Sequence, residues 1–314
     1  KRRLRSLRNS LAKNRDFCLP RGRAKVQQGA MMSFKWTFKE AGPGDRARES
    51  QVEKFFNSDV VANRANAIVR EGIQNSLDAA PKGVIPRVRI ARGCWSVAET
   101  TQRLPKYMKD FQEHFDIKGV RAKINNPPLE GEKFRYLVFE DFGTSGLKGD
   151  PTQWWPSEDR PPNPFFNYFR AEGISDKTEG ARGRHGVGRL VFMFASRVRC
   201  IFGLTRREGN HGSEELLMGT CVLRNHSLGD IPYLADGWFG VPDAQKHGLI
   251  LPISGEDPLI AQFKADFAVS RSSEDGLSVI VPWLSQEVTF EKIVEAVLRG
   301  YFYPILRKNL VVEV

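Results

Sequence analysis

Three polar side chains between residues 71 and 78 have a spacing that could place a chemical site on one face of a helix. Glu71, Asn75 and Asp78 stand at positions i, i+4 and i+7 of a segment, residues 62 to 80, whose pattern predicts a helix. A carboxylate can orient or deprotonate an attacking water, and an amide oxygen suits Mg2+, which keeps its other positions for water and phosphates. These residue types fit the hydrolysis of a phosphoanhydride. The pattern is also typical of a solvated helix face with a fraying end.

A further carboxylate, Asp141, follows the run from Phe134 to Phe139, whose aromatic and β-branched residues predict a buried strand. The turn after it contains Gly143 and Gly146, which have no side chains to block a flat ring. A carboxylate held there can accept hydrogen bonds from the amino group of adenine. An ordinary turn after a strand is the alternative interpretation.

The third segment is a glycine-rich loop that leads into an apolar helix predicted from Arg189 to Ala195. Backbone N–H groups at such a loop and at the start of a helix bind phosphate, because they point outward and the helix dipole favours an anion. Arg189 adds a positive charge nearby. A flexible loop that caps a core helix would give the same pattern. The loop residues are Gly183, His185, Gly186, Val187 and Gly188.

Taken in this order, the three segments resemble the GHKL superfamily of ATPases, whose nucleotide-binding domain has the Bergerat fold. Residues 71–79 match the family's Glu-x-x-x-Asn-x-x-Asp-Ala helix, and residues 183–188 are close to the Gly-Leu-His-Gly-Val-Gly loop of gyrase B. The motifs are most similar to those of gyrase B, MutL-like and MORC-like ATPase domains. The resemblance covers about residues 34 to 284.

The resemblance implies ATP and Mg2+ as cofactors and gives the site residues their roles. Glu71 would be the general base that activates water, Asn75 would hold Mg2+, and Asp141 would recognise adenine. Residues 147–188 would contain the ATP lid, in which Lys177 is a candidate contact to phosphate, although a lone lysine in a polar loop is commonly just solvated. The other candidate nucleotide-binding residues are Asp78, Gly143, Gly146, Gly183, His185, Gly186, Val187, Gly188, Arg189 and Ser278.

Two positions depart from the family pattern. The family's Asp-x-Gly-x-Gly is one residue longer here, so the adenine edge is expected to have a different shape. The family's Gly-Thr strand is represented by residues 276–282, but Leu277 stands where the threonine is expected. Ser278 is a weak candidate for the missing hydroxyl, because neighbouring side chains in a strand point to opposite faces.

The remaining pattern predicts an α+β domain around these segments. We expect a two-layer α/β sandwich in which a mixed, largely antiparallel sheet is covered by helices on one face, with insertions and an ATP lid. Residues 151–169 are rich in Trp, Pro and Phe, which predicts either an insertion packed on the domain or a partner-binding surface. The expected strands are 87–91, 134–141, 197–204, 216–223 and 277–283, and the expected helices are 50–56, an inserted region 98–118 and 287–301.

The sequence divides into three predicted regions. Residues 31–285 form the ATPase domain, and residues 286–314 begin a following, transducer-like region that we expect to continue beyond the β-prone run at residues 310–314. Residues 1–30 hold ten Lys or Arg and one Asp, so they carry most of the net charge of +11. They are interpreted as a disordered arm that follows nucleic-acid phosphates, an organelle presequence, or sequence upstream of a native start at Met31 or Met32.

Composition narrows the class of protein. With 314 residues and 40% hydrophobic content, the chain can bury a large core. No apolar run approaches the ~18 residues of a membrane span, so no membrane association is expected. The four cysteines have no Cys-x-x-Cys spacing, which favours neither zinc nor disulfides and predicts a cytoplasmic location.

Three functions remain open at this point. The first is an ATPase that acts as a nucleotide-driven conformational switch in DNA maintenance or anti-phage defence, with an ATP-dependent homodimer and a DNA or protein partner bound through a region beyond residue 314. The second is a non-hydrolysing nucleotide-binding scaffold, against which Glu71 argues. The third is a histidine kinase, but residues 1–70 contain no histidine that could accept the phosphoryl group.

Overall fold

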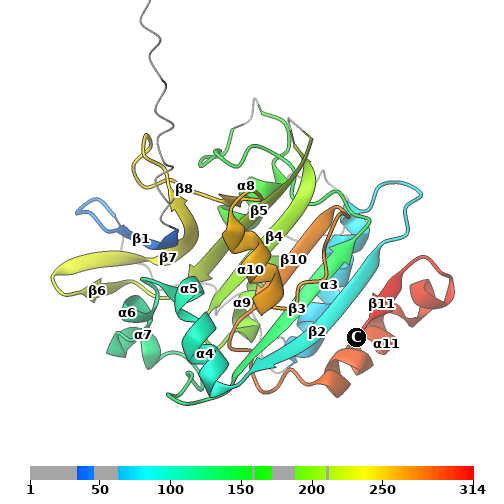
Figure 1. The fold of residues 1–314 in the computed structure, drawn as a ribbon, viewed down its shortest axis with the longest axis horizontal. Coiled ribbons are helices and arrows are strands. Elements are labelled where there is room, and N and C mark those ends of the chain that lie inside the picture. The colour runs from blue at the N-terminus through cyan, green and yellow to red at the C-terminus, as the bar shows by residue number, and fades with distance from the viewer. Residues whose placement is uncertain (1–33, 46–62, 158–159, 172–187, 210–211) are drawn as a thin grey trace, which may run out of the picture. The chain divides into compact units, whose positions relative to one another are not determined.

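A large open sheet forms the centre of the protein (Figure 1). The computed structural model describes residues 34–45, 63–157, 160–171, 188–209 and 212–314. Of the described strand pairs, only β2 and β11 run parallel. In sheet order the strands are β1 (Lys35–Glu40), β7 (Ile231–Pro242), β5 (Gly212–Val222), β4 (Cys200–Gly209), β10 (Gly276–Val281), β3 (Phe134–Phe142), β2 (Arg87–Trp95) and β11 (Val311–Glu313). The short strands β6 (His226–Leu228) and β8 (Ile250–Leu251) pair with β7, and β9 (Ile253–Ser254) pairs with β5.

Helices pack against one face of the sheet through a shared aliphatic core. These are α3 (Arg64–Ala79), α9 (Gly188–Ala195) and α11 (Phe290–Leu306). Leu137 and Phe139 of β3 and Val279 of β10 contribute the sheet side of that core. The α+β class and the largely antiparallel sheet predicted from the sequence are confirmed.

The opposite face is also covered by helices, whereas the prediction placed helices on one face only. The insertion after β2 forms α4 (Val97–Arg103), α5 (Pro105–Met108), α6 (Gln112–Phe115) and α7 (Lys118–Arg121), and α10 (Pro258–Asp266) lies on the same face. Figure 1 shows α10 in front of the sheet and α3 behind it. Aromatic rings fill this second core, with Tyr107 and Phe263 packed edge to face at 5.4 Å.

Helix α3 forms where it was predicted, for reasons that can be read from its residues. The Asn63 side chain caps its first turn by accepting a hydrogen bond from the Asn66 N–H. Ile68 and Ile73 face the sheet and are fully buried. Gly72 lets the helix approach closely, since a Cβ at this position would lie 2.5 Å from the Phe139 ring. The opposite face of α3 is thereby presented outward.

Strand β3 carries two carboxylates at its end. Eight of its nine residues are buried, as expected for a central strand covered on both faces. Because side chains alternate along a strand, Glu140 and Asp141 point to opposite faces of the sheet. Both are nearly inaccessible to solvent, with Glu140 0% and Asp141 7% exposed.

Residues 286–314 share the core of the rest of the domain. Ile293 and Val297 of α11 pack in the same cluster as α3, and β11 extends the sheet beside β2. Residues 33–314 form one compact unit. The predicted extension at residues 1–30 and the predicted helix at residues 50–56 lie outside the described residues.

The aromatic segment at residues 151–169 has two parts. Phe165 and Phe169 of α8 (Pro164–Phe169) are buried against β5, which is the packing predicted for an insertion. Trp154 and Trp155 are 59% and 69% exposed.

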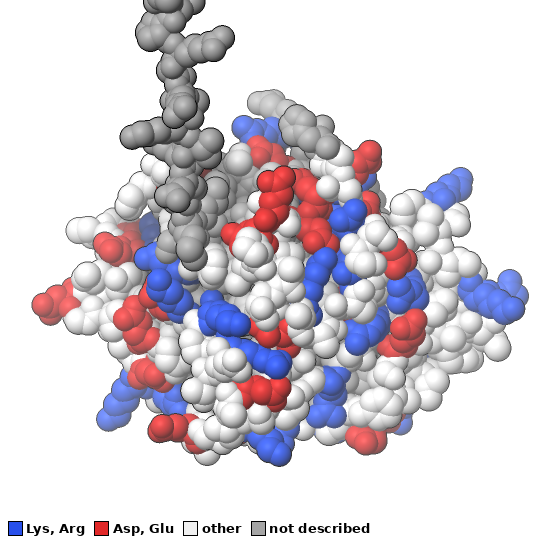
Figure 2. Space-filling view, in the orientation of Figure 1, with Lys and Arg blue, Asp and Glu red and all other residues white. Residues whose placement is uncertain are grey.

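Figure 2 shows basic and acidic side chains interspersed over the face viewed. No helix among the described residues is long and apolar enough to cross a bilayer.

Candidate functional site

The outward face of α3 carries the three polar residues predicted to do chemistry. Glu71 is partly exposed, and its carboxylate accepts a hydrogen bond from the Arg70 guanidinium, with an Nη2–Oε1 distance of 3.1 Å. Asn75 and Asp78 are exposed. The Asp78 carboxylate accepts a hydrogen bond of 2.9 Å from Gln74. The face is therefore accessible to a polar ligand.

The start of α9 lies directly against this face. A Cβ on Gly188 would lie 2.7 Å from Nδ2 of Asn75 and 3.8 Å from Oε2 of Glu71. A side chain at residue 188 would displace the Asn75 amide, which takes part in no hydrogen bond within the described part of the chain. The last glycine of the predicted phosphate loop therefore meets the predicted base and metal ligand.

The second predicted carboxylate is held by groups from three different elements. Oδ1 of Asp141 accepts hydrogen bonds from the Thr144 hydroxyl at 2.6 Å and from the Leu277 N–H at 2.9 Å. Oδ2 lies 3.3 Å from the Ser76 hydroxyl of α3. These contacts join Asp141 to α3 and to β10.

The two carboxylate oxygens differ in how well they are satisfied. The Ser76 hydroxyl has one proton, and its shorter contact is to the Gly72 carbonyl, at 2.9 Å. Oδ2 of Asp141 is thus left with a weak donor, whereas Oδ1 has two good ones. Burial raises the pKa of Asp141, and the Thr144 hydroxyl and Arg271 oppose that shift. A donor from a ligand would satisfy the remaining oxygen.

The turn after Asp141 needs its glycines for a reason other than the one predicted. Gly143 and Gly146 have φ values of +71° and +62°, which favour glycine. A Cβ on Gly146 would lie 2.3 Å from the Arg206 carbonyl oxygen, and one on Gly143 would lie 3.2 Å from Val84. Their missing side chains therefore permit close packing on neighbouring protein segments. Contact with a base stays a prediction.

A partly buried tyrosine near Asp141 was missed by sequence reasoning. The Tyr168 side chain on α8 interacts electrostatically with both Asp141 and Arg189. Its hydroxyl is buried and has no hydrogen-bond partner among the residues that the structure describes. Burial raises the pKa of Tyr168, so the phenol stays protonated and can donate. An unpaired buried hydroxyl costs about 1–3 kcal/mol, which a ligand acceptor would offset.

Two predicted residues serve protein contacts in this structure. The Arg189 guanidinium donates to the backbone carbonyl of Tyr168, so it joins α9 to α8. Ser278 lies on the same side of the sheet as Glu140, because the two are register partners and their side chains are hydrogen-bonded at 3.0 Å. Ser278 is therefore not brought together with Asp141.

The other residues predicted for the phosphate-binding loop and the lid lie outside the described residues. They are Lys177, Gly183, His185, Gly186 and Val187. Their roles stay predictions.

Tyr301 of α11 supports the helix that carries Glu71. Its hydroxyl donates a hydrogen bond of 2.8 Å to the Arg70 carbonyl. Burial and the nearby Glu71 raise the pKa of Tyr301 to about 12, so the donor keeps its proton at neutral pH. α11 thus fixes the segment of α3 that carries Glu71. A tyrosine within an apolar helix gave no sequence pattern that pointed to this role.

The residues gathered here include groups that could hold a purine nucleotide and a magnesium ion. Mg2+ is typically bound in such sites by one or two protein oxygens plus phosphates and water. Asn75 and Glu71 supply oxygens on an accessible face, and Gly188 lets the start of α9 approach both side chains closely. Asp141 and Tyr168 offer an acceptor and a donor that the protein itself leaves poorly satisfied.

A scan against models of protein families and a search of curated proteins both found no match to the chain.

Proposed function

We propose that this chain binds and hydrolyses ATP in a Mg2+-dependent reaction, as a GHKL-type ATPase domain. The observation that carries the proposal is the meeting of Gly188 with Asn75 and Glu71, at the helix that also touches Asp141 through Ser76. The three sequence segments that carry the family resemblance span residues 71 to 188. A nucleotide that contacted the protein at both Gly188 and Asp141 would therefore touch all three segments.

The proposed roles follow from the chemistry of each group. Glu71 takes the proton of the attacking water, and its contact with Arg70 is an exposed ion pair that is worth little energetically and yields easily. The N-terminus of α9 offers backbone N–H groups and a favourable dipole to the phosphates. Asn75 contributes its amide oxygen to Mg2+, which would neutralise phosphate charge when bound.

Asp141 determines which base the proposed site would prefer. Its poorly satisfied Oδ2 is an acceptor for the exocyclic amino group of adenine. Guanine and hypoxanthine carry a carbonyl oxygen at that position and would face the carboxylate with an acceptor. The proposed substrate is therefore ATP.

The wider biological role rests on the family resemblance alone. We propose a conformational switch in which closure of the lid within residues 147–188 changes partner binding. The setting would be DNA maintenance or anti-phage defence, with an ATP-dependent homodimer. A cytoplasmic location is proposed from cysteine usage.

The experiment that tests the function measures phosphate release and ATP affinity of the purified chain, with Mg2+ and with EDTA. We expect release from ATP in Mg2+, and loss of that release in EDTA, because the phosphates need the cation. GTP should bind more weakly than ATP. An ATP affinity no better than that for GTP would contradict the proposal.

Replacing Tyr168 by phenylalanine should have opposite effects on stability and on binding. The melting temperature without nucleotide should be unchanged or higher, because the variant loses a buried hydroxyl for which the described part of the chain supplies no partner. The Kd for ATP should rise by about fivefold to tenfold if the phenol donates to the nucleotide. Thermal unfolding and calorimetric titration measure the two effects.

Tyr107→Phe is the matched control. The Tyr107 hydroxyl donates a hydrogen bond of 2.6 Å to Asp266 on the other face of the sheet. Its loss should lower the melting temperature and leave the Kd for ATP unchanged. Equal Kd values for wild type and Tyr168→Phe would exclude the phenol as a ligand.

A further inference from the structure

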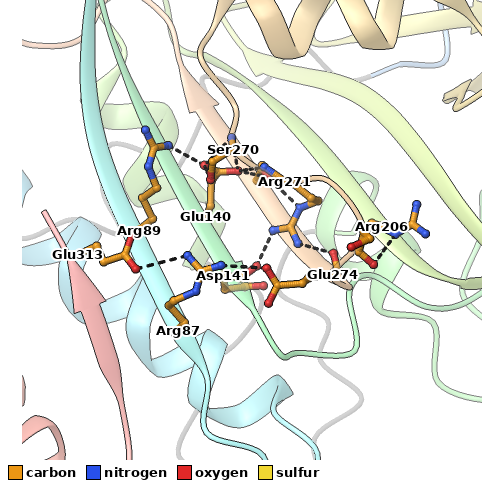
Figure 3. Close-up of polar contacts among 11 residues, drawn as sticks. Arg87, Arg89, Glu140, Asp141, Arg206, Ser270, Arg271, Glu274 and Glu313 are labelled. Carbon is orange, nitrogen blue, oxygen red and sulfur yellow. Dashed lines mark hydrogen bonds and ion pairs between the residues drawn. The ribbon is translucent and has the colours of Figure 1, made fainter.

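Glu140 is the centre of a buried ionic cluster on the face of the sheet opposite to Asp141 (Figure 3). It accepts hydrogen bonds from the Ser270 hydroxyl at 2.8 Å, the Ser278 hydroxyl at 3.0 Å and the Arg89 guanidinium at 2.7 Å. The backbone N–H groups of Ser270 and Arg271 also donate to it. These donors lower its pKa although burial opposes them. An ionised Glu140 therefore anchors the loop that enters β10.

Arg271 connects this anchor to the proposed base-recognition site. Its side chain is 2% exposed, and its Nε donates to the Ser278 hydroxyl at 3.0 Å. Nη1 donates to the Glu274 carbonyl at 2.9 Å, and Nη2 donates to the main-chain carbonyl of Asp141. The guanidinium thus binds the Asp141 peptide, the end of the loop before β10 and β10 itself.

Gly276 completes the fit between this loop and Asp141. Its φ of +146° is unusual for a residue with a side chain. A Cβ at this position would lie 2.3 Å from the Asp141 carbonyl oxygen and 2.6 Å from its Oδ1. The next residue, Leu277, donates its N–H to that same Oδ1. The loop therefore directs a backbone hydrogen bond to Oδ1 of Asp141 and not to Oδ2.

We propose that Arg271 is a positioning residue that sets the base specificity of the site. The inference rests on the proposed function, and it adds the means by which adenine is distinguished. Arg271 holds the Asp141 peptide and the start of β10 in register, so Oδ1 receives the Leu277 N–H and Oδ2 faces the base. Without this constraint the carboxylate can turn or shift, and its preference for an amino group over a carbonyl falls.

Arg89 provides a matched control within the same cluster. The Arg89 guanidinium, on β2, forms an ion pair with Glu140, and the Arg271 backbone N–H donates to the same carboxylate from the loop. The Arg89 side chain makes no contact with Asp141. Replacing either arginine disturbs the surroundings of Glu140. Only the Arg271 substitution removes the donor to the Asp141 peptide.

The experiment compares ATP with ITP, in which a carbonyl oxygen replaces the amino group. For wild type and Arg89→Gln we expect ATP to bind roughly 10- to 100-fold more tightly than ITP, the range for one hydrogen bond to a charged group. For Arg271→Gln the ratio of the two Kd values should fall to within about threefold, because the acceptor is no longer fixed. A purely structural role would weaken both nucleotides equally and leave the ratio unchanged.

A milder pair of variants serves if Arg271→Gln does not fold. Ser278→Ala and Ser270→Ala each remove one hydroxyl that donates to Glu140. Only Ser278→Ala also removes an acceptor of Arg271. The ratio should fall for Ser278→Ala and stay at the wild-type value for Ser270→Ala.

The outcomes separate the inference from the proposed function. Wild type that binds ATP in preference to ITP, together with a folded Arg271→Gln or Ser278→Ala variant of unchanged ratio, would overturn the role of Arg271 alone. Wild type that binds neither nucleotide would overturn the proposed function and the role of Arg271 with it. A ratio that falls equally in the Arg89 and Ser270 variants would also contradict the proposal.

Discussion

Replacing Glu71 by alanine is expected to lower ATP turnover at least about 100-fold and to leave the Kd for ATP within about tenfold of wild type. The reason is that the carboxylate lies on the accessible face of α3 beside Gly188, where an attacking water would need a base. It has no role in the core, so the fold should tolerate the change. Steady-state phosphate release and equilibrium binding measure the two quantities separately.

Glu295→Ala is the control for this prediction. Glu295 is also an exposed helical carboxylate paired with a nearby arginine, at 2.7 Å from Arg299, but it lies on α11. Its removal should change neither turnover nor affinity. Turnover by Glu71→Ala at the wild-type rate would exclude Glu71 as the base, and loss of binding instead of turnover would make it a ligand contact.

Replacing Asp141 by asparagine is expected to raise the Kd for ATP by roughly 10- to 100-fold. Thr144 and Leu277 both donate to Oδ1, so the asparagine must place its amide oxygen there. Its NH2 group then occupies the position of Oδ2 and faces the amino group of adenine. In the variant, two hydrogen-bond donors would face each other. In the wild type, Oδ2 of Asp141 is an acceptor that faces the amino group of adenine. Calorimetric titration with ATP measures the change.

The same substitution should not destabilise the protein. A carboxyl group whose pKa is raised on folding lowers the stability of the folded state once it is ionised. This cost is absent below the unfolded pKa of about 3.8, and it reaches its full size above the raised pKa of the folded state. At neutral pH, asparagine removes this cost. We therefore expect an equal or higher melting temperature together with the weaker binding. A lower melting temperature with unchanged affinity would assign Asp141 to structure alone.

The elements that carry the site were predictable because their patterns are local. The spacing of Ile68 and Ile73 against the polar face of Glu71 and Asn75 predicts α3, which forms over Arg64–Ala79. The apolar run before Asp141 predicts β3 in the same way. What lies beside each element was only partly predictable, since it depends on pairing between distant segments.

The second helical layer shows this limit clearly. Residues 98–118 were predicted to be helical, but the face they cover depends on β2 and β3, whose other side is already packed by α3. The position of Ser278 shows the same limit. Its register opposite Glu140 decides its side of the sheet, and no local pattern states that register.

The contacts of Tyr168 and Arg271 were also not predictable from sequence. Tyr168 is one aromatic residue in a segment rich in them, and only the fold shows that its hydroxyl is buried with no partner in the described segments. Arg271 stands in a polar loop, where arginine is commonly exposed, yet its guanidinium is buried behind Asp141. Both roles come from long-range packing.

The position of β10 has a consequence for how the protein is made. β10 is paired with β3 on one side and β4 on the other, so it alone joins the two halves of the sheet. Its contact between Ser278 and Glu140 spans 138 residues of chain. Contacts of such long range form late and slowly. During synthesis, Asp141 can therefore accept the Leu277 N–H only after residue 277 has left the ribosome and β10 has paired with β3.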